Sequence, residues 1–518
     1  MSIFTTNAMG NYPSNTFDLS HNVKLTCKDG LLYPICNLDV LPGDKLNISN
    51  QILCRLMPML SPVMHEMDIT VTHHFVPLRL LWSTGYERFF AQPIPDDDTP
   101  VHPYFSEIVV ENGSLSDYLG LPTRIFHSDS GEPLPQYATI DKVSAMFHAA
   151  YQKIYNDWYR DQNLILEVPD TLTDGLNSFT HFDVLRRRAW QHDYFTAALP
   201  FAQKGEAVEI PIAEFDDVPV KYNSTLGAFA EWETTGGSEF PATITAKVAA
   251  ANNSLDGNTL FADTSTLSDA ASVTINALRW ANKLQEFLER NARGGTRYIE
   301  LVRSHFGVIS SDARQQRAEF LGWSRTPIVI SEVLTQANTE AGGEPVGVTG
   351  EMYGHGIGVG RTKNAFYRAE EHGIFMSLLS IRPKTNYSQG IPRKFSRFQA
   401  VDYPWPEFAH LGEQEVKNRE IFYGYDALND ETFGYMQRYA EAKYENDRYA
   451  GDMRTSLNYW HMGRIFEGRP SLNQTFIECR PTRRIFNVTA EVNDQFVLHI
   501  KNQIQARRIL PKFGIPSL

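Results

Sequence analysis

The order of strand-like and helical segments most constrains the fold of this 518-residue chain. Residues 22–82 predict strands, and side chains at 67–74 follow the two-residue period of a β-strand. Helical spacing follows at 141–161 and 181–195, whereas the chain after residue 323 is again mainly strand and loop. Because alternating strand–helix–strand units do not occur, the pattern favours an antiparallel β-sandwich with long insertions over a doubly wound parallel sheet.

A break in composition interrupts this pattern. No Arg occurs from Ala189 to Leu278, and 241–275 is dominated by Ala, Thr, Ser, Asn and Gly. Small polar residues tolerate exposure and variation, so we expect a surface insertion at 215–275. The region is too apolar for a plainly disordered segment, because it contains Leu226, Phe229, Trp232, Phe240 and Phe261.

The segment "NARGGTRYIELVRSHFG" at 291–307 predicts a helix that ends at paired glycines, followed by a second short helix. Glu300 and His305 are five positions apart, which on a helix turns them roughly 140° from each other. They therefore do not form an acid–base pair. We interpret the segment as a structural joint, with ion-pair anchors at Arg293, Arg297 and Arg303.

Charge and cysteine content exclude several classes of protein. The net charge of −13 argues against a general nucleic-acid binder, so any such contact requires a local basic face. The four cysteines (27, 36, 54 and 479) lack zinc-site spacing, and we expect them to be free and buried; a pairing of Cys27 with Cys36 across a hairpin is the alternative. The start of the sequence has no signal-peptide pattern and no apolar run is long enough to span a membrane, so we expect cytoplasmic synthesis.

Motifs for catalysis or cofactor binding are weak. "YGHGIGVGR" at 353–361 fits neither the dinucleotide nor the phosphate-loop pattern, and we predict a flexible loop there. His73 and His74 are adjacent on a strand and point to opposite faces, so they do not chelate one ion. "PIPDDDTP" at 93–100 predicts an exposed acidic turn, with calcium at a subunit contact as the alternative. We expect no cofactor, and a glycosidase-like carboxylate pair has no positive support.

The C-terminal segment has the opposite charge to the chain as a whole. Its basic residues are interleaved with Phe486, Phe496 and Phe513, so they are candidates for contact with a nucleic-acid backbone. A solvated face or a salt-bridged subunit contact is the alternative. These basic residues are Arg480, Arg483, Arg484, Lys501, Arg507, Arg508 and Lys512.

Several segments, in order along nearly the whole chain, resemble one protein family. They are "FDLSHNVKLTC" (17–27), "VLPGD" (40–44), "PVMHEMDITVTHHFVPLRLLW" (62–82), "YNDWYRDQNL" (155–164), "HDYFTAALPFAQKG" (192–205), "ARGGTRYIELVRSHFGVISSDARQQRAEFLG" (292–322), "EHGIFMSLLSIRP" (371–383), "WPEFAHLGEQEV" (405–416) and "FGYMQRYAEAKY" (433–444). The chain resembles the major capsid proteins of the Microviridae, specifically those of gokushovirus-type single-stranded DNA bacteriophages.

The resemblance implies one viral jelly-roll domain over 1–518, built on an eight-stranded antiparallel sandwich. Within it we expect a helix-containing insertion at 83–214, a surface insertion at 215–275, a helical joint at 276–322, and the remaining strands and long loops at 323–518. The resemblance further implies a small icosahedral shell of T=1 type, with pentamers and with trimeric contacts at threefold protrusions formed by 215–275.

The resemblance also implies partners. These are the circular single-stranded DNA genome, other phage proteins (a DNA pilot, a small basic DNA-binding protein and scaffolding proteins) and a bacterial surface receptor met by the protrusion. The protein would be a non-enzymatic part of the virion capsid, assembled in the cytoplasm of the host bacterium without membrane insertion. The rival interpretation is a jelly-roll carbohydrate-binding protein or glycoside-active enzyme, which needs a concave aromatic–carboxylate groove.

Overall fold

The computed structural model of the chain describes residues 13–91, 100–123, 140–206, 208, 220–222, 230–234, 244–248, 260–262, 275–295, 297–334, 340–341, 344–345, 352–487 and 493–513. The chain divides into two compact units. The first contains residues 1–202 and 294–518, and the second contains residues 203–293.

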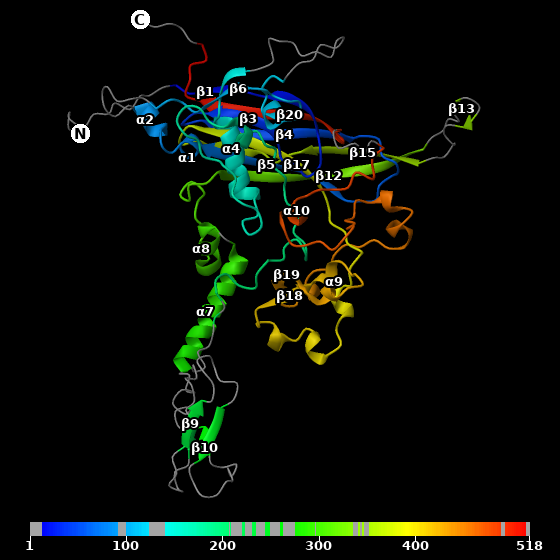
Figure 1. Cartoon of the computed structure of the whole chain (residues 1–518). Helices are drawn as coiled ribbons and strands as arrows, with labels where there is room; N and C mark the ends of the chain where they lie inside the picture. Colours follow the sequence, from blue (N-terminus) through cyan, green and yellow to red (C-terminus); the bar gives the residue numbers. More distant parts are fainter. Residues whose placement is uncertain are drawn as a thin grey trace, which may run out of the picture. The chain divides into compact units, whose positions relative to one another are not determined.

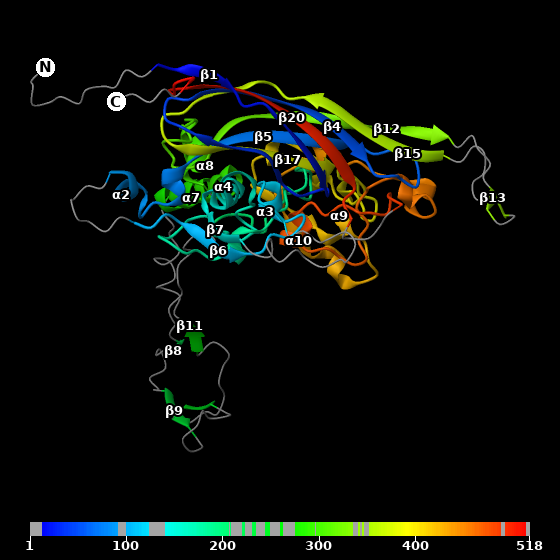
Figure 2. The same cartoon turned by 90° about the horizontal axis from the view of Figure 1, so that it is seen from above.

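The first unit is built on one large antiparallel sheet, which curls so that one face encloses a core (Figures 1 and 2). The strand order is β1-β20-β4-β15-β12-β5-β17-β3, with β2 also paired to β20 and β16 to β4. This mainly antiparallel β architecture with long insertions is consistent with the predicted jelly roll. The strands are β1 (Asn15–Asp18), β2 (His21–Cys27), β3 (Tyr33–Val40), β4 (Lys45–Leu56), β5 (Met67–Pro77), β12 (Glu319–Leu334), β15 (Met352–Arg361), β16 (Ala365–Arg368), β17 (Gly373–Pro383) and β20 (Phe496–Arg508).

The two halves of the sheet differ in how their outer faces are covered. On β5 and β17 nearly every side chain is buried, because α4 (Met146–Ile154) and its neighbouring segments pack against the outer face. Figure 2 shows these segments on one side of the sheet. On β20, by contrast, buried and exposed side chains alternate from Phe496 to Arg507, so its outer face meets solvent. One outer face of the sandwich is therefore free of covering insertions in the described chain.

Short elements connect the strands and cover the buried half of the sheet. They are α1 (Leu78–Leu81), α2 (Tyr86–Ala91), β6 (Tyr104–Ile108), α3 (Leu115–Tyr118), β7 (Ile140–Ser144), η3 (Tyr155–Tyr159) and α5 (Phe179–Phe182). The helix predicted at 141–161 is confirmed from Met146 to Tyr159 as α4 and η3, whereas its predicted start belongs to strand β7. None of the described helices is long and apolar enough to cross a membrane.

The helix predicted at 181–195 is wrong, because only α5 reaches into this range. The backbone here bonds to other segments instead of to itself. The amide of Leu32 donates to the Arg186 carbonyl at 3.0 Å, and the amide of Arg188 donates to the Gly30 carbonyl at 2.8 Å. The Arg188 carbonyl in turn accepts from the amide of Cys479 at 2.8 Å. Tertiary pairing thus overrides the helical spacing of the side chains.

The glycine-rich stretch predicted as a flexible loop is instead strand β15, paired with β4 and β12. Its glycines lie where the backbone closely approaches neighbouring atoms. A Cβ on Gly354 would lie 2.1 Å from the Ser61 carbonyl oxygen, and one on Gly356 would lie 2.8 Å from a Leu56 methyl. Glycine in a strand often marks such a close approach, and here it recurs with the two-residue period of the strand.

The second unit contains two hairpin-like strand pairs, β8 (Val220–Tyr222) with β11 (Leu260–Ala262) and β9 (Ala230–Thr234) with β10 (Ile244–Val248). It also contains most of α7 (Ile275–Gly294), the helix that the sequence predicts to end at paired glycines. The following helix, α8 (Tyr298–Phe306), belongs to the first unit and ends at Gly307, whose φ of +69° is the left-handed conformation typical of a C-cap.

A lobe formed by residues 384–478 packs within the first unit around an aromatic core that also includes Tyr194 and Phe195, and it is yellow and orange in Figure 1. It contains β18 (Glu413–Lys417), α9 (Asn418–Ile421), β19 (Thr432–Gln437) and α10 (Gln474–Ile477). Its 3-10 turns are η6 (Arg393–Phe395), η7 (Ala400–Asp402), η8 (Pro406–Phe408), η9 (Ala427–Asp430), η10 (Ala440–Ala442), η11 (Gly451–Arg454) and η12 (Asn458–Trp460). The small strands β13 (Glu340–Ala341) and β14 (Glu344–Pro345) pair with each other elsewhere in the first unit.

Candidate nucleic-acid interface

Six of the seven basic residues predicted to face nucleic acid fall into two groups. Arg480, Arg483 and Arg484 lie in the loop that precedes the last strand, whereas Lys501, Arg507 and Arg508 lie on β20. Lys512 follows β20 and is exposed, with its Nζ 5.9 Å from the centroid of the Phe513 ring.

The arginines of the loop have partners inside the chain. The Arg484 guanidinium donates to the carbonyls of Asn458 at 2.7 Å, His461 at 3.0 Å and Gly463 at 2.8 Å, and burial lowers its pKa. Arg480 pairs with Glu478 at 2.7 Å. These contacts join the loop to the lobe, so Arg484 in particular has a structural role.

Arg483 lies near a buried carboxylate, that of Asp29. Burial raises the pKa of Asp29 to about 6, and the positive charges of Arg483 and Arg187 oppose that rise. One carboxylate oxygen of Asp29 is buried without a hydrogen-bond partner in the described structure. The positive charge of Arg483 therefore partly offsets the cost of burying the Asp29 carboxylate.

On β20 the period of the strand separates adjacent arginines. Arg507 is exposed on the outer face and donates through Nε to the Ser14 hydroxyl at 2.8 Å. Arg508 points the other way, where its Nε lies 3.1 Å from the carboxylate of the fully buried Asp44. Arg508 therefore neutralises a buried charge, whereas Arg507 and Lys501 remain on the outer face.

Strand pairing brings further basic residues beside Lys501 and Arg507. Arg507 is opposite Lys45 on β4, and Lys45 is opposite Arg368 on β16. Lys501 and Arg361 are both opposite Gln51, one on each side of β4. We define the basic sheet face as the exposed residues Lys24, Lys45, Arg55, Arg361, Arg368, Lys501 and Arg507.

The basic sheet face carries little compensating negative charge. Among the described residues, none of its seven side chains forms an ion pair with a carboxylate. Among the residues that the structure describes, one acidic residue, Asp18 on β1, occupies an outward position on β1, β2, β4, β15, β16 or β20. Hydrogen bonds from Ser20 chiefly lower the pKa of Asp18, and Lys501 contributes less. In a chain of net charge −13, this face is thus a local region of positive potential.

Sequence reasoning missed Lys24, Lys45, Arg55, Arg361 and Arg368. Each is on a strand distant in sequence from β20, and only the register of the sheet brings them together. The two-residue period of β4 was a signal that Lys45 and Arg55 share a face, but it did not reveal which strands lie beside it.

The remaining predicted residues have different positions. Arg297 pairs with Glu300 at 3.2 Å and donates to the Asn156 carbonyl at 2.5 Å, so it anchors α8 to η3. Arg303 is exposed on α8, and Arg293 lies in the last turn of α7. Trp232 and Phe261 lie on β9 and β11, whereas Leu226, Phe229 and Phe240 lie outside the described residues.

The cysteines and the candidate metal ligands are the last of the predicted residues. All four cysteines are buried and unbridged, as predicted. The described part of the chain contains no cluster of three or more His, Cys, Asp or Glu that could hold a metal ion. The acidic residues Asp96, Asp97 and Asp98 lie outside the described residues, so the calcium alternative stays a prediction.

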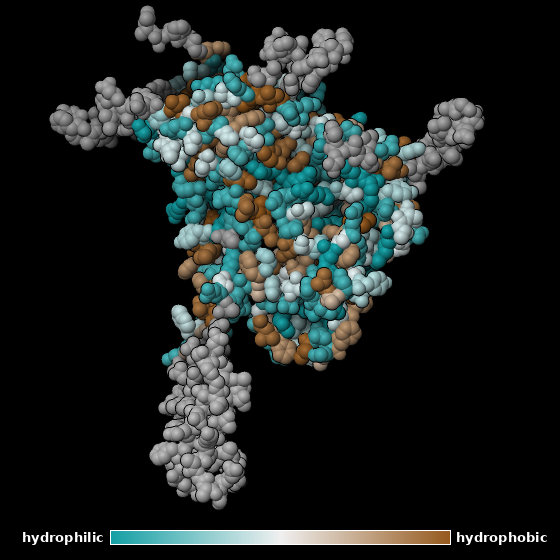
Figure 3. Space-filling model, viewed as in Figure 1, coloured by the Kyte–Doolittle hydropathy of each residue, from teal (hydrophilic) through white to brown (hydrophobic). Residues whose placement is uncertain are grey.

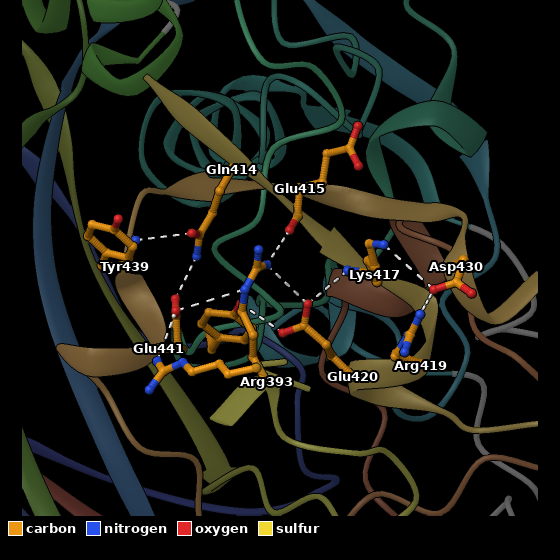
Figure 4. Close-up of polar contacts among 11 residues, drawn as sticks. Arg393, Gln414, Glu415, Lys417, Arg419, Glu420, Asp430, Tyr439 and Glu441 are labelled. Carbon is orange, nitrogen blue, oxygen red and sulfur yellow. Dashed lines mark hydrogen bonds and ion pairs between the residues drawn. The ribbon is translucent and has the colours of Figure 1, made fainter. Parts of the chain in front are cut away.

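One cavity beside the lobe is lined by aromatic and carboxylate side chains. It is lined by Tyr194, Tyr387, Glu420 and Glu441 among others, but its volume is about 80 Å³, below the roughly 300 Å³ of the smallest usual ligand pockets. Arg393 lies between the two carboxylates, 3.3 Å from Glu420 and 3.8 Å from Glu441 (Figure 4). The carboxylates are thus bound within the chain and lack room for a sugar.

The uncovered sheet with its basic face and the long insertions form a mainly antiparallel β fold that is consistent with a capsid jelly roll. A sequence model of the family described as "Capsid protein (F protein)" matches residues 8–518. The chain therefore belongs to this phage capsid family, and it is a structural major capsid protein.

Individual relatives of the chain are also capsid proteins. The chain is 35% identical to capsid protein VP1 of Bdellovibrio phage phiMH2K, over 91% of this chain and 89% of the relative. It is 31% identical to capsid protein VP1 of Chlamydia phage 1, over 97% and 95% of the two chains. It is 29% identical to capsid protein VP1 of Spiroplasma virus 4, over 90% and 88%. The resemblance to gokushovirus-type capsid proteins is thereby confirmed.

Proposed function

We propose that the chain assembles in the cytoplasm of a host bacterium into a T=1 icosahedral shell around a circular single-stranded DNA genome, with the basic sheet face turned toward the DNA. The observation that carries this proposal is a row of cations on an uncovered sheet that have no carboxylate partners among the described residues. Phosphate contacts by Lys and Arg bind nucleic acid without reading sequence, which suits a shell that encloses a whole genome.

The test is a charge reversal within the basic sheet face. Lys501→Glu combined with Arg361→Glu changes two residues that both neighbour Gln51 in the sheet. Both side chains are exposed and without ion pairs among the described residues, so we expect the subunit to fold. Particles of this variant should contain several-fold less nuclease-protected DNA than wild-type particles.

The matched control is Lys443→Glu combined with Arg454→Glu, which makes the same change in net charge at exposed positions of the lobe. It should leave DNA content near the wild-type value. Equal DNA content in all three particles, or an equal loss in both variants, would refute the orientation. Arg508 is unsuitable for this test, because its reversal would also disturb the buried Asp44.

We further propose that the insertion contacts the bacterial surface. Its support is the division of the chain, in which residues 203–293 form a second compact unit. Replacing 223–259 by a short Gly-Ser turn keeps the β8–β11 pair while removing β9 and β10. Particles should still assemble but should bind host cells at least tenfold less. Normal adsorption by these particles would refute a role in attachment.

A further inference from the structure

The lobe exposes several large apolar side chains. They include Phe395, Phe398, Tyr403, Trp405, Leu411 and Tyr425, and we call them the aromatic surface. Phe398 is 83% exposed and Leu411 is 61% exposed. In Figure 3 hydrophobic residues gather on the lower part of this lobe. Large exposed apolar areas on a soluble protein often mark a site where another protein binds.

The aromatic surface is ordered even though it is exposed. The Asp402 carboxylate accepts hydrogen bonds from the backbone amides of Phe398 at 2.9 Å and Gln399 at 2.8 Å. The Trp405 indole donates to the Ala400 carbonyl at 2.7 Å. A surface held in place before it binds loses little conformational entropy on binding, so this geometry favours a specific contact.

Buried ion pairs fix the base of the same segment. Arg393 bonds to Glu420, and Arg397 bonds to Glu441 at 3.2 Å. Glu441 also accepts from Gln414 at 2.6 Å, and Figure 4 shows how Gln414, Arg393 and the two carboxylates converge. These contacts turn the charged groups inward, so the apolar groups are left on the outside.

The charge distribution indicates which class of partner fits. Lys417 and Arg419 both pair with Asp430, and Arg393 and Arg397 pair with carboxylates. The cations near the aromatic surface are therefore neutralised, unlike those of the basic sheet face. Nucleic acid needs positive charge for its phosphates, whereas the core of a protein interface is poor in charge and rich in aromatic residues.

We propose that the aromatic surface is a contact with a second copy of this chain in the shell. Residues 395–411 together with 423–428 approach the roughly 20–30 residues that each side of a standard interface contributes. A closed shell requires every subunit to bury such surfaces against its neighbours, and rigid aromatic anchors carry most of the energy at interfaces. This proposal rests on the assembly proposed above, and it names one of the surfaces that assembly uses.

The test places charge in the aromatic surface. Phe398→Asp combined with Leu411→Asp should reduce particles, measured by sedimentation of the expressed protein, at least tenfold. Circular dichroism and thermal unfolding of the unassembled subunit should match the wild type, because both side chains are exposed. The control, Phe398→Tyr combined with Leu411→Met, keeps the apolar area and should assemble normally. Normal assembly of the Asp variant would overturn the proposal.

A second measurement identifies the occupant without perturbing the fold. A photo-crosslinking benzoylphenylalanine in place of Phe398 should give covalent dimers of the chain in assembled particles. Crosslinks to DNA, or to a different phage protein with none between copies of the chain, would overturn the proposal while leaving the shell assignment intact. If the wild-type chain forms no shells at all, the proposed assembly fails, and this contact fails with it.

Discussion

Two adjacent arginines on β20 show how strand period assigns different roles to identical residues. Arg507 lies on the solvent side, whereas Arg508 reaches the buried Asp44 and donates to the Asp39 carbonyl at 2.6 Å. A run of basic residues in a sequence thus combines surface charge with internal ion pairs. Only the first kind is available to a nucleic acid.

This difference predicts unequal effects on stability. Arg508→Gln leaves the Asp44 carboxylate buried without its cation, and it should lower the free energy of unfolding of the subunit by about 1–3 kcal/mol. Arg507→Gln should change it by less than about 0.5 kcal/mol. Urea denaturation of both variants measures this. Equal effects would contradict the separate roles assigned to the two arginines.

His148 links stability to pH. Burial lowers its pKa to about 4, and its Nε2 lies 2.8 Å from the Ser116 hydroxyl. Because the folded pKa lies below the unfolded value of about 6.5, His148 contributes stability above pH 6.5 that is lost as the pH falls toward 4.

The expected size of this effect is up to about 3 kcal/mol between pH 7 and pH 4. His148→Gln retains a group that can bond to Ser116 and cannot titrate, so the variant should lose less stability on acidification. Denaturation at pH 7 and pH 5 compares the two proteins. A wild-type pH dependence that the variant fully retains would show that His148 does not contribute.

At the scale of elements, β15 shows what glycines do inside a sheet. Gly354→Ala should cost about 1–3 kcal/mol, because the new Cβ meets the Ser61 carbonyl and the strand must shift. Val359→Thr, at an exposed position of the same strand, should be nearly neutral. The midpoints of chemical denaturation distinguish them. A stable Gly354→Ala protein would show that the close approach is dispensable.

The elements differ in how well their own sequence predicts them. β5 was predictable from its period, because Met67, Ile69 and Val71 share the inner core. The end of α8 was predictable because a local signal, Gly307, suffices. The segment 181–195 was not, since its backbone bonds to Gly30 and Leu32, just before β3, and to Cys479. β15 was not predictable either, because its glycines are needed for close contacts with residues that are distant in sequence.

At the scale of the whole molecule, the basic sheet face and the lobe differ in how their cations are paired. The cations of the basic sheet face have no carboxylate partners among the described residues, whereas the cations near the aromatic surface of the lobe are paired with carboxylates. The family and the β-sandwich were predictable from the sequence, because their signals extend along the chain. The basic sheet face was only partly predictable, because Lys501 and Arg507 gain their neighbours from the register of β2, β4, β15 and β16.

Electron cryomicroscopy of assembled particles tests the orientation of the subunit most directly. A reconstruction at side-chain resolution should place Lys45, Lys501 and Arg361 on the inner surface of a T=1 shell, beside density for the packaged DNA. It should also place Phe398 between two subunits. A shell in which these three basic residues lie on the outer surface would contradict the account.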